Sequence, residues 1–489
     1  MYLGIDVGTS SIKVVMIDED QNIIFEVSEE LKISNDKPLY SEQNPEDWYI
    51  ALMKIFLFLR ENYKDKINQL ISIGLTGQMH GAVCIDANGK VIRPAILWND
   101  GRSYQECNNL TQNNSDFESI SANKVMPGFT APKILWMQNN EKNNFRKIHK
   151  VLLPKDYIRY RLTGEFATDM SDASGTSWLD VRNRKWSGSL LSSCGLSEKN
   201  MPNLFEGNEC TGNLLKEIKL ILEISHDVKV VAGASDNAAG ALSMGVYKPG
   251  SAVISLGTSG VYFTPSERFR SNTDGGLHTF CHALPNTWHY MGVILSAASG
   301  LSWWKKISKI KSEGDLINIA KKYNDDHLPL FLPYLSGERT PHNDPFARAS
   351  FVGMTHSTGI SEFAQAVLEG VSFAIADCED SIYSSGAEIN HVSVIGGGAK
   401  SSYWGEIIST IISKDLMYHN ESAVGPAFGA ARLALLEDSG AELSNILKKP
   451  CITAKIFPRE DLVNKLHSRL KLYRESYTQL SRIFKKIGV

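Results

Sequence analysis

Two parts of the chain show the same order of an apolar strand, a tight turn and a second apolar strand. The first part covers residues 2–17, with Gly8 to Ser11 as its turn, and the second covers residues 251–264, with Gly257 to Gly260 as its turn. Glycine, serine and threonine are typical of tight turns between strands. The two Gly-Thr-Ser triplets lie about half the chain apart, and this weak repetition predicts two related halves that each open with a β-hairpin.

Runs with helical periodicity lie between further strand-like runs. Asn44-Pro45-Glu46 is typical of a helix start, an N-cap residue followed by proline at the first position, and it opens an amphipathic run to about Glu61. A second helical run opens at Ser361, where apolar residues recur at helical spacing. Strands that alternate with such helices predict α/β domains. The strand-like runs cover residues 71–75, 229–232 and 392–395.

The length of the chain predicts two domains. Its 489 residues exceed the roughly 250–300 residues at which a single hydrophobic core usually stops growing. Glycine, serine and proline cluster at residues 240–250, between a helical run and a strand-like run, as is typical of a domain boundary. We therefore expect an N-terminal domain of residues 1–245, a C-terminal domain of residues 246–489 and a cleft between them.

The composition favours small-molecule chemistry in a reducing compartment. With a net charge of -3 and no long run of Lys or Arg, the chain has no electrostatic feature for binding nucleic acid or an anionic membrane. Its seven cysteines are scattered, without the spacing of a zinc site or a redox pair. No secretory signal opens the chain, and the uncharged stretch 279–304 contains His, Pro and Asn, which a lipid-facing helix would avoid. We expect a cytoplasmic protein without a membrane span.

Three glycine-rich turns follow apolar strands, at residues 4–13, 255–260 and 395–401. Glycine lets the backbone approach a ligand closely, so that successive N–H groups can converge on an anion. Each turn by itself could be an ordinary hairpin or strand-to-helix turn. Together the three turns favour a nucleotide triphosphate. The sequence contains neither GxxxxGK[ST] nor the complete dinucleotide fingerprint, so it supports neither a P-loop nor a Rossmann site.

Two aspartates could carry chemistry, and the first of them lies next to one of these turns. Asp6 interrupts an apolar strand, and beside a triphosphate such an acid would hold Mg²⁺, through water. The alternative is an acid satisfied by backbone N–H groups or by a buried cation. Asp236 stands between an apolar strand and a small-residue helix, where it could accept a proton from a substrate hydroxyl, as the catalytic aspartate of kinases does. The compatible alternative is that Ser235 or Asp236 caps the helix.

His80 and the segment around Trp98 could contact a sugar. His80 lies between Gly77 and Gly81 after a strand, and it could bond to a sugar hydroxyl or be a satisfied structural histidine. Residues 98–102 read WNDGR, in which Asp-Gly indicates a turn. The aromatic ring and the charges of this turn could also line a sugar pocket.

Several longer stretches together closely resemble the FGGY carbohydrate kinases. The most distinctive are GQMHGA at 77–82, RPAILWNDGR at 93–102 and FLPYLSGERTPHN at 331–343, and the resemblance weakens only after about Leu436. It implies an α/β fold of two actin-like, ribonuclease-H-like ATPase domains with an interdomain cleft that closes on MgATP and sugar. Within the family the resemblance is closest to members that act on D-xylulose. It therefore implies formation of D-xylulose 5-phosphate with ATP and Mg²⁺, and a possible homodimer.

The resemblance also assigns roles to individual residues. The general base falls on Asp236 and the important N-terminal acid on Asp6, the candidate Mg²⁺ ligand. The sugar contacts fall on Gln78, Met79, His80 and Asn237. The nucleotide-binding residues are Gly8, Thr9 and Ser10 in the first hairpin, Gly257 and Thr258 in the second, and Gly397, Gly398 and Ala399 in the adenosine segment. In the mechanism that we expect, Lys13 of the first hairpin assists at the phosphates.

Two other interpretations stay open at this point. A kinase of the same family that acts on ribulose, another ketose, glycerol or a sugar acid would share these turns, and only the GQMHGA and WNDGR segments argue against it. An ATPase of the actin or heat-shock-chaperone class would use the same hairpins to drive a conformational change. Its partner would be a peptide or further copies of itself.

Overall fold

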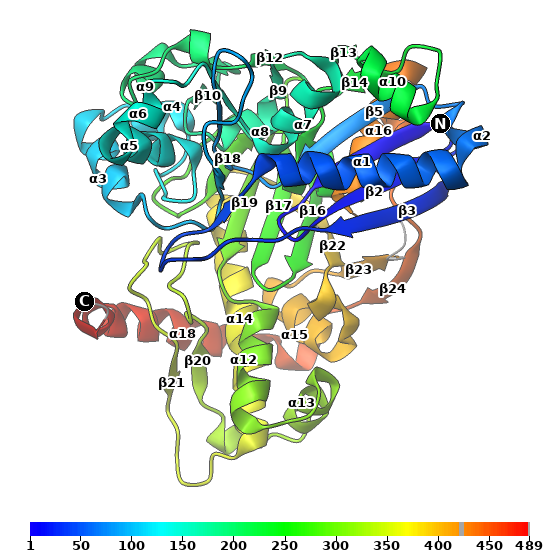
Figure 1. Ribbon diagram of the computed structural model, residues 1–489. Helices are drawn as coiled ribbons and strands as arrows, with labels where there is room; N and C mark the ends of the chain where they lie inside the picture. Colours follow the sequence, from blue (N-terminus) through cyan, green and yellow to red (C-terminus); the bar gives the residue numbers. More distant parts are fainter. Residues whose placement is uncertain (420–424, 488–489) are drawn as a thin grey trace. The chain divides into compact units, whose positions relative to one another are not determined.

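The computed structural model describes residues 1–419 and 425–487, which divide between two compact units (Figure 1). Unit 1 consists of Met1–Tyr247, Phe280–Trp288 and the described part of Ser422–Pro450. Unit 2 consists of Lys248–Thr279 and the described parts of His289–Glu421 and Cys451–Val489. The chain therefore enters each unit more than once, whereas the sequence predicted a single boundary near residue 245. Which domain binds the sugar and which binds the nucleotide stays a prediction.

The sheet of unit 1 begins with the predicted hairpin. Strands β1 and β2 pair antiparallel around the turn at Gly8, and β3 adds antiparallel to β2. On the other side of β1, β5 and then β14 continue the sheet in parallel. The strand order is β13-β14-β5-β1-β2-β3, and β15 pairs with β5. The strands are β1 Tyr2–Val7, β2 Ser11–Ile17, β3 Ile23–Glu30, β5 Ser72–Gly77, β13 Cys210–Asn213, β14 Lys229–Val231 and β15 Ala234–Ser235.

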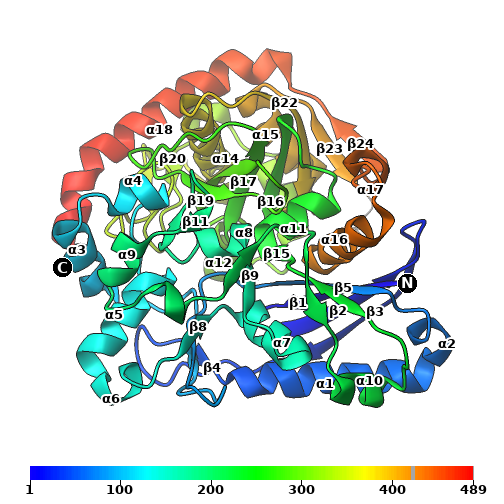
Figure 2. The ribbon, with the colours of Figure 1, turned by 90° about the horizontal axis from the view of Figure 1, so that it is seen from above.

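Helices cover both faces of this sheet. Helix α1 (Pro45–Asn62) and helix α7 (Pro154–Thr163) share one hydrophobic core with the sheet. Helix α11 (Asp236–Ser243) and helix α16 (Pro426–Ser439) share the other. Figure 2 shows α1 and α16 on opposite sides of β1 and β5. The predicted start of α1 is confirmed, because the Asn44 side chain accepts a hydrogen bond from the N–H of Glu46 at 3.3 Å.

Alternation along β1 decides what each of its residues faces. Leu3, Ile5 and Val7 lie in the core with α1 and α7, whereas Tyr2 lies in the core with α11 and α16. Gly4 faces α16 closely, since a Cβ there would lie 1.8 Å from the carbonyl oxygen of Ala427. Because strand residues two apart share a face, Asp6 is directed to the same face as Gly4. The acid therefore lies on the side of the sheet where α11 begins.

Unit 2 has the same arrangement of a hairpin followed by parallel strands. Strands β16 and β17 pair antiparallel around the turn at Gly257, and β22 and β23 continue in parallel beside β16. The order is β19-β17-β16-β22-β23-β24. These strands are β16 Gly250–Leu256, β17 Gly260–Ser266, β19 Trp288–Ile294, β22 Ile389–Ile395, β23 Leu416–His419 and β24 Ile452–Ile456. The helices in its core are α12 Ala298–Ser308, α13 Glu313–Ala320, α14 Ile360–Ser384, α15 Ser402–Ile412 and α18 Glu460–Ile487.

The prediction of a β-hairpin at the start of each half is confirmed by both sheets. Among the helices of the described residues, none combines the length and the apolar character that crossing a membrane requires.

Candidate active site

Asp6, near the end of β1, lies within the electrostatic influence of Asp236, the first residue of α11. Burial raises the pKa of Asp6, the negative charge of Asp236 raises it further and Lys13 lowers it, which brings the value to about 7. Oδ1 of Asp6 is shielded from solvent and accepts no hydrogen bond within residues 1–419 and 425–487. An acid satisfied by neighbouring N–H groups does not account for this oxygen. A cation or a metal-bound water fits it.

Mg²⁺ suits this environment because it keeps much of its hydration shell and takes few protein carboxylates. In the described part of the chain, no three His, Cys, Asp or Glu side chains are grouped as a metal site of their own. Asp6 would therefore hold the ion with few other protein ligands.

Asp236 is held by the residue that follows it. Its Oδ1 accepts the backbone N–H of Asn237 at 2.7 Å and the side-chain amide of Asn237 at 2.8 Å. Burial raises the pKa of Asp236 to about 6, although these two hydrogen bonds lower it. Ser235 occupies the N-cap position without a side-chain cap hydrogen bond, so its hydroxyl does not cap the helix. A half-buried carboxylate with a pKa near neutrality is suited to accept a proton from a hydroxyl group.

His80 is fixed through both its ring and its backbone. Its φ of 68° lies in the left-handed region, which a residue with a side chain rarely adopts. Nδ1 lies 2.7 Å from the carbonyl oxygen of Gly175, and the ring stacks on Phe129 with centroids 4.5 Å apart. The carbonyl oxygen of His80 accepts hydrogen bonds from Thr130 Oγ1 and Lys133 Nζ, each at 3.0 Å. Strained residues held by several contacts cluster at functional sites, which supports a role for His80.

Lys133 is a residue that sequence reasoning missed. It is fully buried, and burial lowers its pKa well below the ordinary value, with Asp100 acting in the opposite direction. Its ammonium also donates to the carbonyl oxygen of Gly128 at 2.7 Å. The only available signal was its place in the stretch MPGFTAPK, residues 126–133, which gave no reason to expect a buried lysine.

The predicted sugar contacts form two local pairs in unit 1. Met79 and His80 pack together against Gly175, where a Cβ would lie 2.9 Å from Met79 Cε and 2.5 Å from His80 Nδ1. Asn237 bonds to Asp236 as described above. Glycine at position 175 is therefore required for the present positions of both side chains.

Gln78 supports the first turn. Its Oε1 accepts the hydroxyl of Thr9 at 3.1 Å, and its Nε2 donates to the carbonyl oxygen of Gly8 at 3.4 Å and to Gln43 Oε1 at 3.0 Å. Gln43 in turn donates to the carbonyl oxygen of Thr9 at 2.8 Å. The indole N–H of Trp98 donates to Thr9 Oγ1 at 3.1 Å. Gln78 therefore supports the turn, and its role as a sugar contact stays a prediction.

The charges of the WNDGR segment are satisfied internally. Asp100 is buried and lies 2.7 Å from Arg102, whose guanidinium also lies 2.6 Å from Glu42. Trp98 is exposed, with 47% of its surface open to solvent. Asp100 and Arg102 therefore neutralise each other inside the protein, and a place for this segment in a sugar pocket stays a prediction.

Two further predicted residues of the first hairpin make contacts with β3 and with the residue that follows it. Lys13 stands opposite Asp6 in the strand register, yet its ammonium lies 2.7 Å from Glu26 on β3. Ser10 is exposed, and its carbonyl oxygen accepts the N–H of Leu31 at 2.9 Å. Their roles in nucleotide binding stay predictions.

The second turn is held by the start of α12. The carbonyl oxygen of Gly257 accepts the N–H of Ala298 at 2.9 Å. The carbonyl oxygen of Thr258 accepts the N–H of Ala297 at 3.0 Å and the hydroxyl of Ser299 at 2.7 Å. These bonds fix the turn from its carbonyl side.

A pocket of about 560 Å³ lies beside this turn in unit 2. Its volume falls in the range of about 300–1,000 Å³ that is usual for small-molecule sites. Gly397 and Gly398 line it, at the start of a short helical turn, Gly397–Lys400, that contains Ala399. Other lining residues are Ala298, Leu301, Ser302, Glu313, Gly314, Ile317, Asn318, Lys321, Lys400, Ser401, Ser402, Tyr403 and Trp404. The predicted adenosine segment therefore lies in a cavity of suitable size.

The glycines of this segment differ in what surrounds them. Gly396 has a φ of 93°, and a Cβ there would lie 2.8 Å from the carbonyl oxygen of Leu256. Gly398 is equally confined, since a Cβ would lie 2.7 Å from the ring of Trp404. A Cβ on Gly397 would meet nothing within 4 Å. The packing of unit 2 therefore explains Gly396 and Gly398 but leaves Gly397 unexplained.

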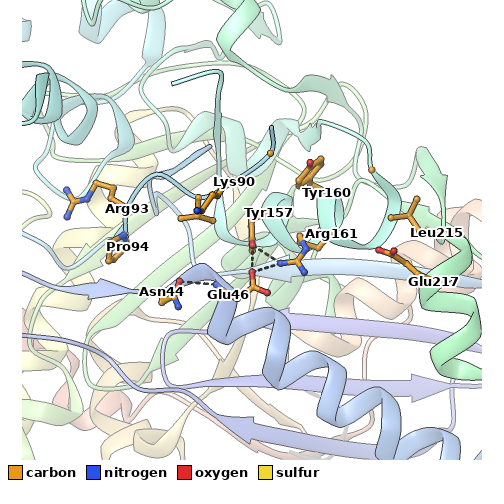
Figure 3. A pocket seen from close by; sticks show the side chains of 13 residues that line it. Asn44, Glu46, Lys90, Arg93, Pro94, Tyr157, Tyr160, Arg161, Leu215 and Glu217 are labelled. Carbon is orange, nitrogen blue, oxygen red and sulfur yellow. Dashed lines mark hydrogen bonds and ion pairs between the residues drawn. The ribbon is translucent and has the colours of Figure 1, made fainter. Parts of the chain in front are cut away.

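A second pocket, of about 540 Å³, lies in unit 1 and contains no predicted site residue (Figure 3). In Figure 3 the side chains of Tyr157 and Arg161 point toward Glu46 along its wall. The hydroxyl of Tyr157 donates to Glu46 Oε2 at 2.9 Å, and Arg161 bonds to the same oxygen. This wall joins α7 to the start of α1.

Comparison with known proteins assigns the whole chain to one group. The model of the N-terminal domain of the FGGY family of carbohydrate kinases matches residues 1–243, and the model of the family's C-terminal domain matches residues 252–437. Over 482 residues the chain is 46% identical to the xylulose kinase of Escherichia coli (strain K12). The aligned region covers 98% of this chain and 99% of that protein.

Solved structures agree with these matches. The crystal structure of a xyloylose kinase from Brucella ovis has a TM-score of 0.96 and 44% identity, covering 99% of both chains. A gluconate kinase from Lactobacillus acidophilus has a TM-score of 0.93 at 23% identity, also over 99% of both chains. The second likeness shows the fold alone.

Proposed function

Because the chain belongs to the FGGY family of carbohydrate kinases, we propose that it transfers the γ-phosphoryl group of ATP to D-xylulose, forming D-xylulose 5-phosphate. The observation that carries the choice of sugar is the 46% identity, over nearly the full length, to a protein named as a xylulose kinase. Membership of a carbohydrate kinase family removes the alternative of an actin-like or chaperone-like ATPase.

Asp236 is the general base of the proposed reaction. Asn237 occupies its Oδ1, so Oδ2 accepts the proton of the C5 hydroxyl. The hydroxyl oxygen then forms the new bond to the γ-phosphorus while the bond to ADP breaks. A pKa of about 6 keeps the carboxylate mostly ionised at neutral pH and still close to the value at which proton transfer is efficient.

Asp6 would hold Mg²⁺, because its shielded Oδ1 is without a hydrogen-bond partner among the described residues. The ion, when bound, offsets negative charge on the phosphate oxygens. Proximity of a cation also favours the ionised form of Asp6, against the burial that raises its pKa.

The phosphates are assigned to the backbone of the two hairpin turns and the adenosine to the pocket beside Gly397. Side-chain amides of Gln43 and Gln78 bind the carbonyl oxygens of the turn at Gly8, and backbone N–H groups at the start of α12 bind those of the turn at Gly257. These bonds pre-organise the N–H groups of both turns for an anion. His80 and Met79 contact the ketose in this proposal, with Trp98 near the first turn. A cytoplasmic location and a homodimer stay predictions.

The test is a coupled assay of ADP release over a panel of ketoses, polyols and sugar acids. D-xylulose should give the highest kcat/KM, and ribulose, glycerol and gluconate should give much lower values. The panel is needed because the fold is shared with a gluconate kinase. If a sugar acid or a polyol exceeds D-xylulose, the choice of sugar is wrong.

Asp236→Asn is the matching variant, which keeps the size of the side chain and removes its basicity. Loss of a general base typically lowers turnover by about 10²–10⁴-fold. We expect that loss in kcat, while the affinity for ATP, measured by calorimetry, stays within about 2-fold. Turnover close to that of the unchanged enzyme would remove Asp236 from its role.

A further inference from the structure

Four charged side chains are buried together in unit 1, beside the segment that carries Asp236. Lys155 Nζ, on α7, lies 2.5 Å from Asp156 Oδ1, 2.8 Å from Asp169 Oδ1 and 3.4 Å from Asp172 Oδ2. All four side chains have no exposed surface. Burying ions in this way is strongly unfavourable unless the groups are paired, and hydrophobic residues would often serve stability as well. Such a cluster therefore calls for a role besides packing.

The cluster is connected to the base through Asp169 and Ser171. Asp169 Oδ2 accepts the N–H of Ser171 at 2.7 Å and also the hydroxyl of Ser171. The same hydroxyl oxygen, Ser171 Oγ, accepts the backbone N–H of Ser235 at 2.9 Å. Ser235 directly precedes Asp236. A continuous path of contacts thus runs from the ammonium of Lys155 to the backbone next to the base.

Arg159 holds the same segment from its other end. It lies one turn after Lys155 on α7 and is fully buried. Its guanidinium donates to the carbonyl oxygen of Val231 at 2.6 Å and to that of Ala232. Between these carbonyls and Ser235 lies Gly233, where φ is 78° and a Cβ would lie 1.8 Å from the carbonyl oxygen of Leu75. One helix therefore fixes the segment 231–235 at both ends.

The outer face of α7 is fixed as well. Tyr157 and Arg161 bond to Glu46 at the start of α1, as Figure 3 shows, and the guanidinium of Arg161 lies 3.6 Å from the ring centroid of Tyr49. These contacts tie α7 to α1. The helix is therefore anchored on its outer face as well as through Lys155 and Arg159.

We propose that Lys155, acting through Asp169 and Ser171, is a positioning residue for phosphoryl transfer, which fixes the backbone at Ser235 and so aims the carboxylate of Asp236. This inference rests on the proposed function, because it takes Asp236 as the base. The charges of the cluster agree with it. Burial raises the pKa of Asp172, Lys155 lowers it, and the nearby carboxylates Asp169, Asp156 and Asp236 raise it again, so the electrostatics of the cluster and of the base are connected.

Ser171→Ala is the informative variant. Substitution of Lys155 would leave buried carboxylates without their cation and would be expected to unfold the protein. Ser171→Ala removes only the hydroxyl that joins Asp169 to Ser235. Misplacement of a reacting group by about 1 Å can lower a rate on the order of 100-fold. We expect kcat with D-xylulose to fall about 10-fold or more, with KM for MgATP and for the ketose within about 2-fold.

Ser174→Ala is the matched control. Ser174 lies on the same short helix, Met170–Ser174, is equally buried, and its hydroxyl oxygen also accepts a backbone N–H, that of Cys281 at 3.0 Å. This variant loses an equivalent hydrogen bond that does not lead to the base, so its kcat should stay within about 2-fold. Ser171→Thr, which keeps a hydroxyl group, should regain most of the activity lost in Ser171→Ala.

The outcomes separate the two proposals. If Ser171→Ala and Ser174→Ala lower the melting temperature by the same amount and change kcat by the same factor, Ser171 is merely structural. The positioning proposal is then overturned. If Asp236→Asn keeps near-normal turnover, the base itself is wrongly assigned and both proposals fall. A loss of kcat confined to Ser171→Ala, together with an inactive Asp236→Asn, supports both.

Discussion

Asp6 should make the folded protein less stable as the pH rises. The ordinary pKa of its carboxyl group is 3.8, and the folded protein raises it to about 7. When folding raises the pKa of a group, its contribution to the free energy of unfolding is complete below the pKa of the unfolded state. That contribution is lost as the pH rises to the pKa of the folded state. At about 1.4 kcal/mol per pKa unit, the loss above pH 7 reaches at most about 4 kcal/mol. Because Asp6 keeps some contact with solvent, we expect about half of that.

Asp6→Asn tests this reasoning. The amide keeps the size of the side chain and cannot ionise, so the variant should gain about 2 kcal/mol at pH 8 and almost nothing at pH 4. Since 1 kcal/mol shifts the melting temperature of a domain of this size by about 2–4 °C, the gain at pH 8 should be about 4–8 °C. Turnover with MgATP should be lost in the same variant.

Thermal unfolding at the two pH values, without nucleotide, measures the effect. Asp20→Asn, which neutralises an exposed acid in the loop after β2, is the control and should show the same small change at both pH values. An equal change of Asp6→Asn at pH 4 and pH 8, or a loss of stability at pH 8, would refute the argument that Asp6 is ionised against burial.

Two further predictions concern glycines. Gly397→Val should raise KM for ATP about 10-fold without lowering the melting temperature, because the new side chain enters an open pocket. Gly396→Ala should instead lower the melting temperature by several degrees, because Gly396 has a positive φ that alanine adopts only with strain. If both variants leave KM for ATP unchanged, the adenosine does not bind there. Gly175→Ala should displace the ring of His80 and raise KM for the ketose about 10-fold at unchanged KM for ATP, whereas Gly188→Ala, with no neighbour closer than 3.9 Å, should have no effect. An unaltered KM for the ketose in Gly175→Ala would remove His80 from the sugar site.

Local signals in the sequence were enough for the elements that open each half. The two hairpins, the start of α1 at Asn44 and the strand before Gly396 depend on turn residues, caps and alternation within a few positions of each other. The position of Asp6 could also be anticipated, since an acid in an apolar strand is visible without any tertiary contact.

Long-range packing was beyond the reach of such signals. Helix α16 packs against Gly4 of β1 although more than 400 residues separate them in the chain. The residues around Gly4 therefore gave no signal that a helix packs there. The burial of Lys155 and Lys133 was hidden for the same reason. Each has a partner from a distant segment, Asp169 for Lys155 and the carbonyl oxygen of His80 for Lys133, and a lysine in an isolated helix pattern predicts a solvent-exposed position.

The two hairpins differ at the position of Asp6, to which we assign the metal ion. Asp6 lies two residues before Gly8, and Ser255 lies two residues before Gly257. Both positions have a parallel neighbour in the sheet, Asp6 opposite Thr76 and Ser255 opposite Ile395. The same scaffold therefore offers a phosphate-type turn in each unit, but an ionisable acid only in unit 1. A second shielded carboxylate would lower stability at neutral pH and repel the phosphates, so we interpret the turn of unit 2 as a site that binds through its backbone without a charge of its own.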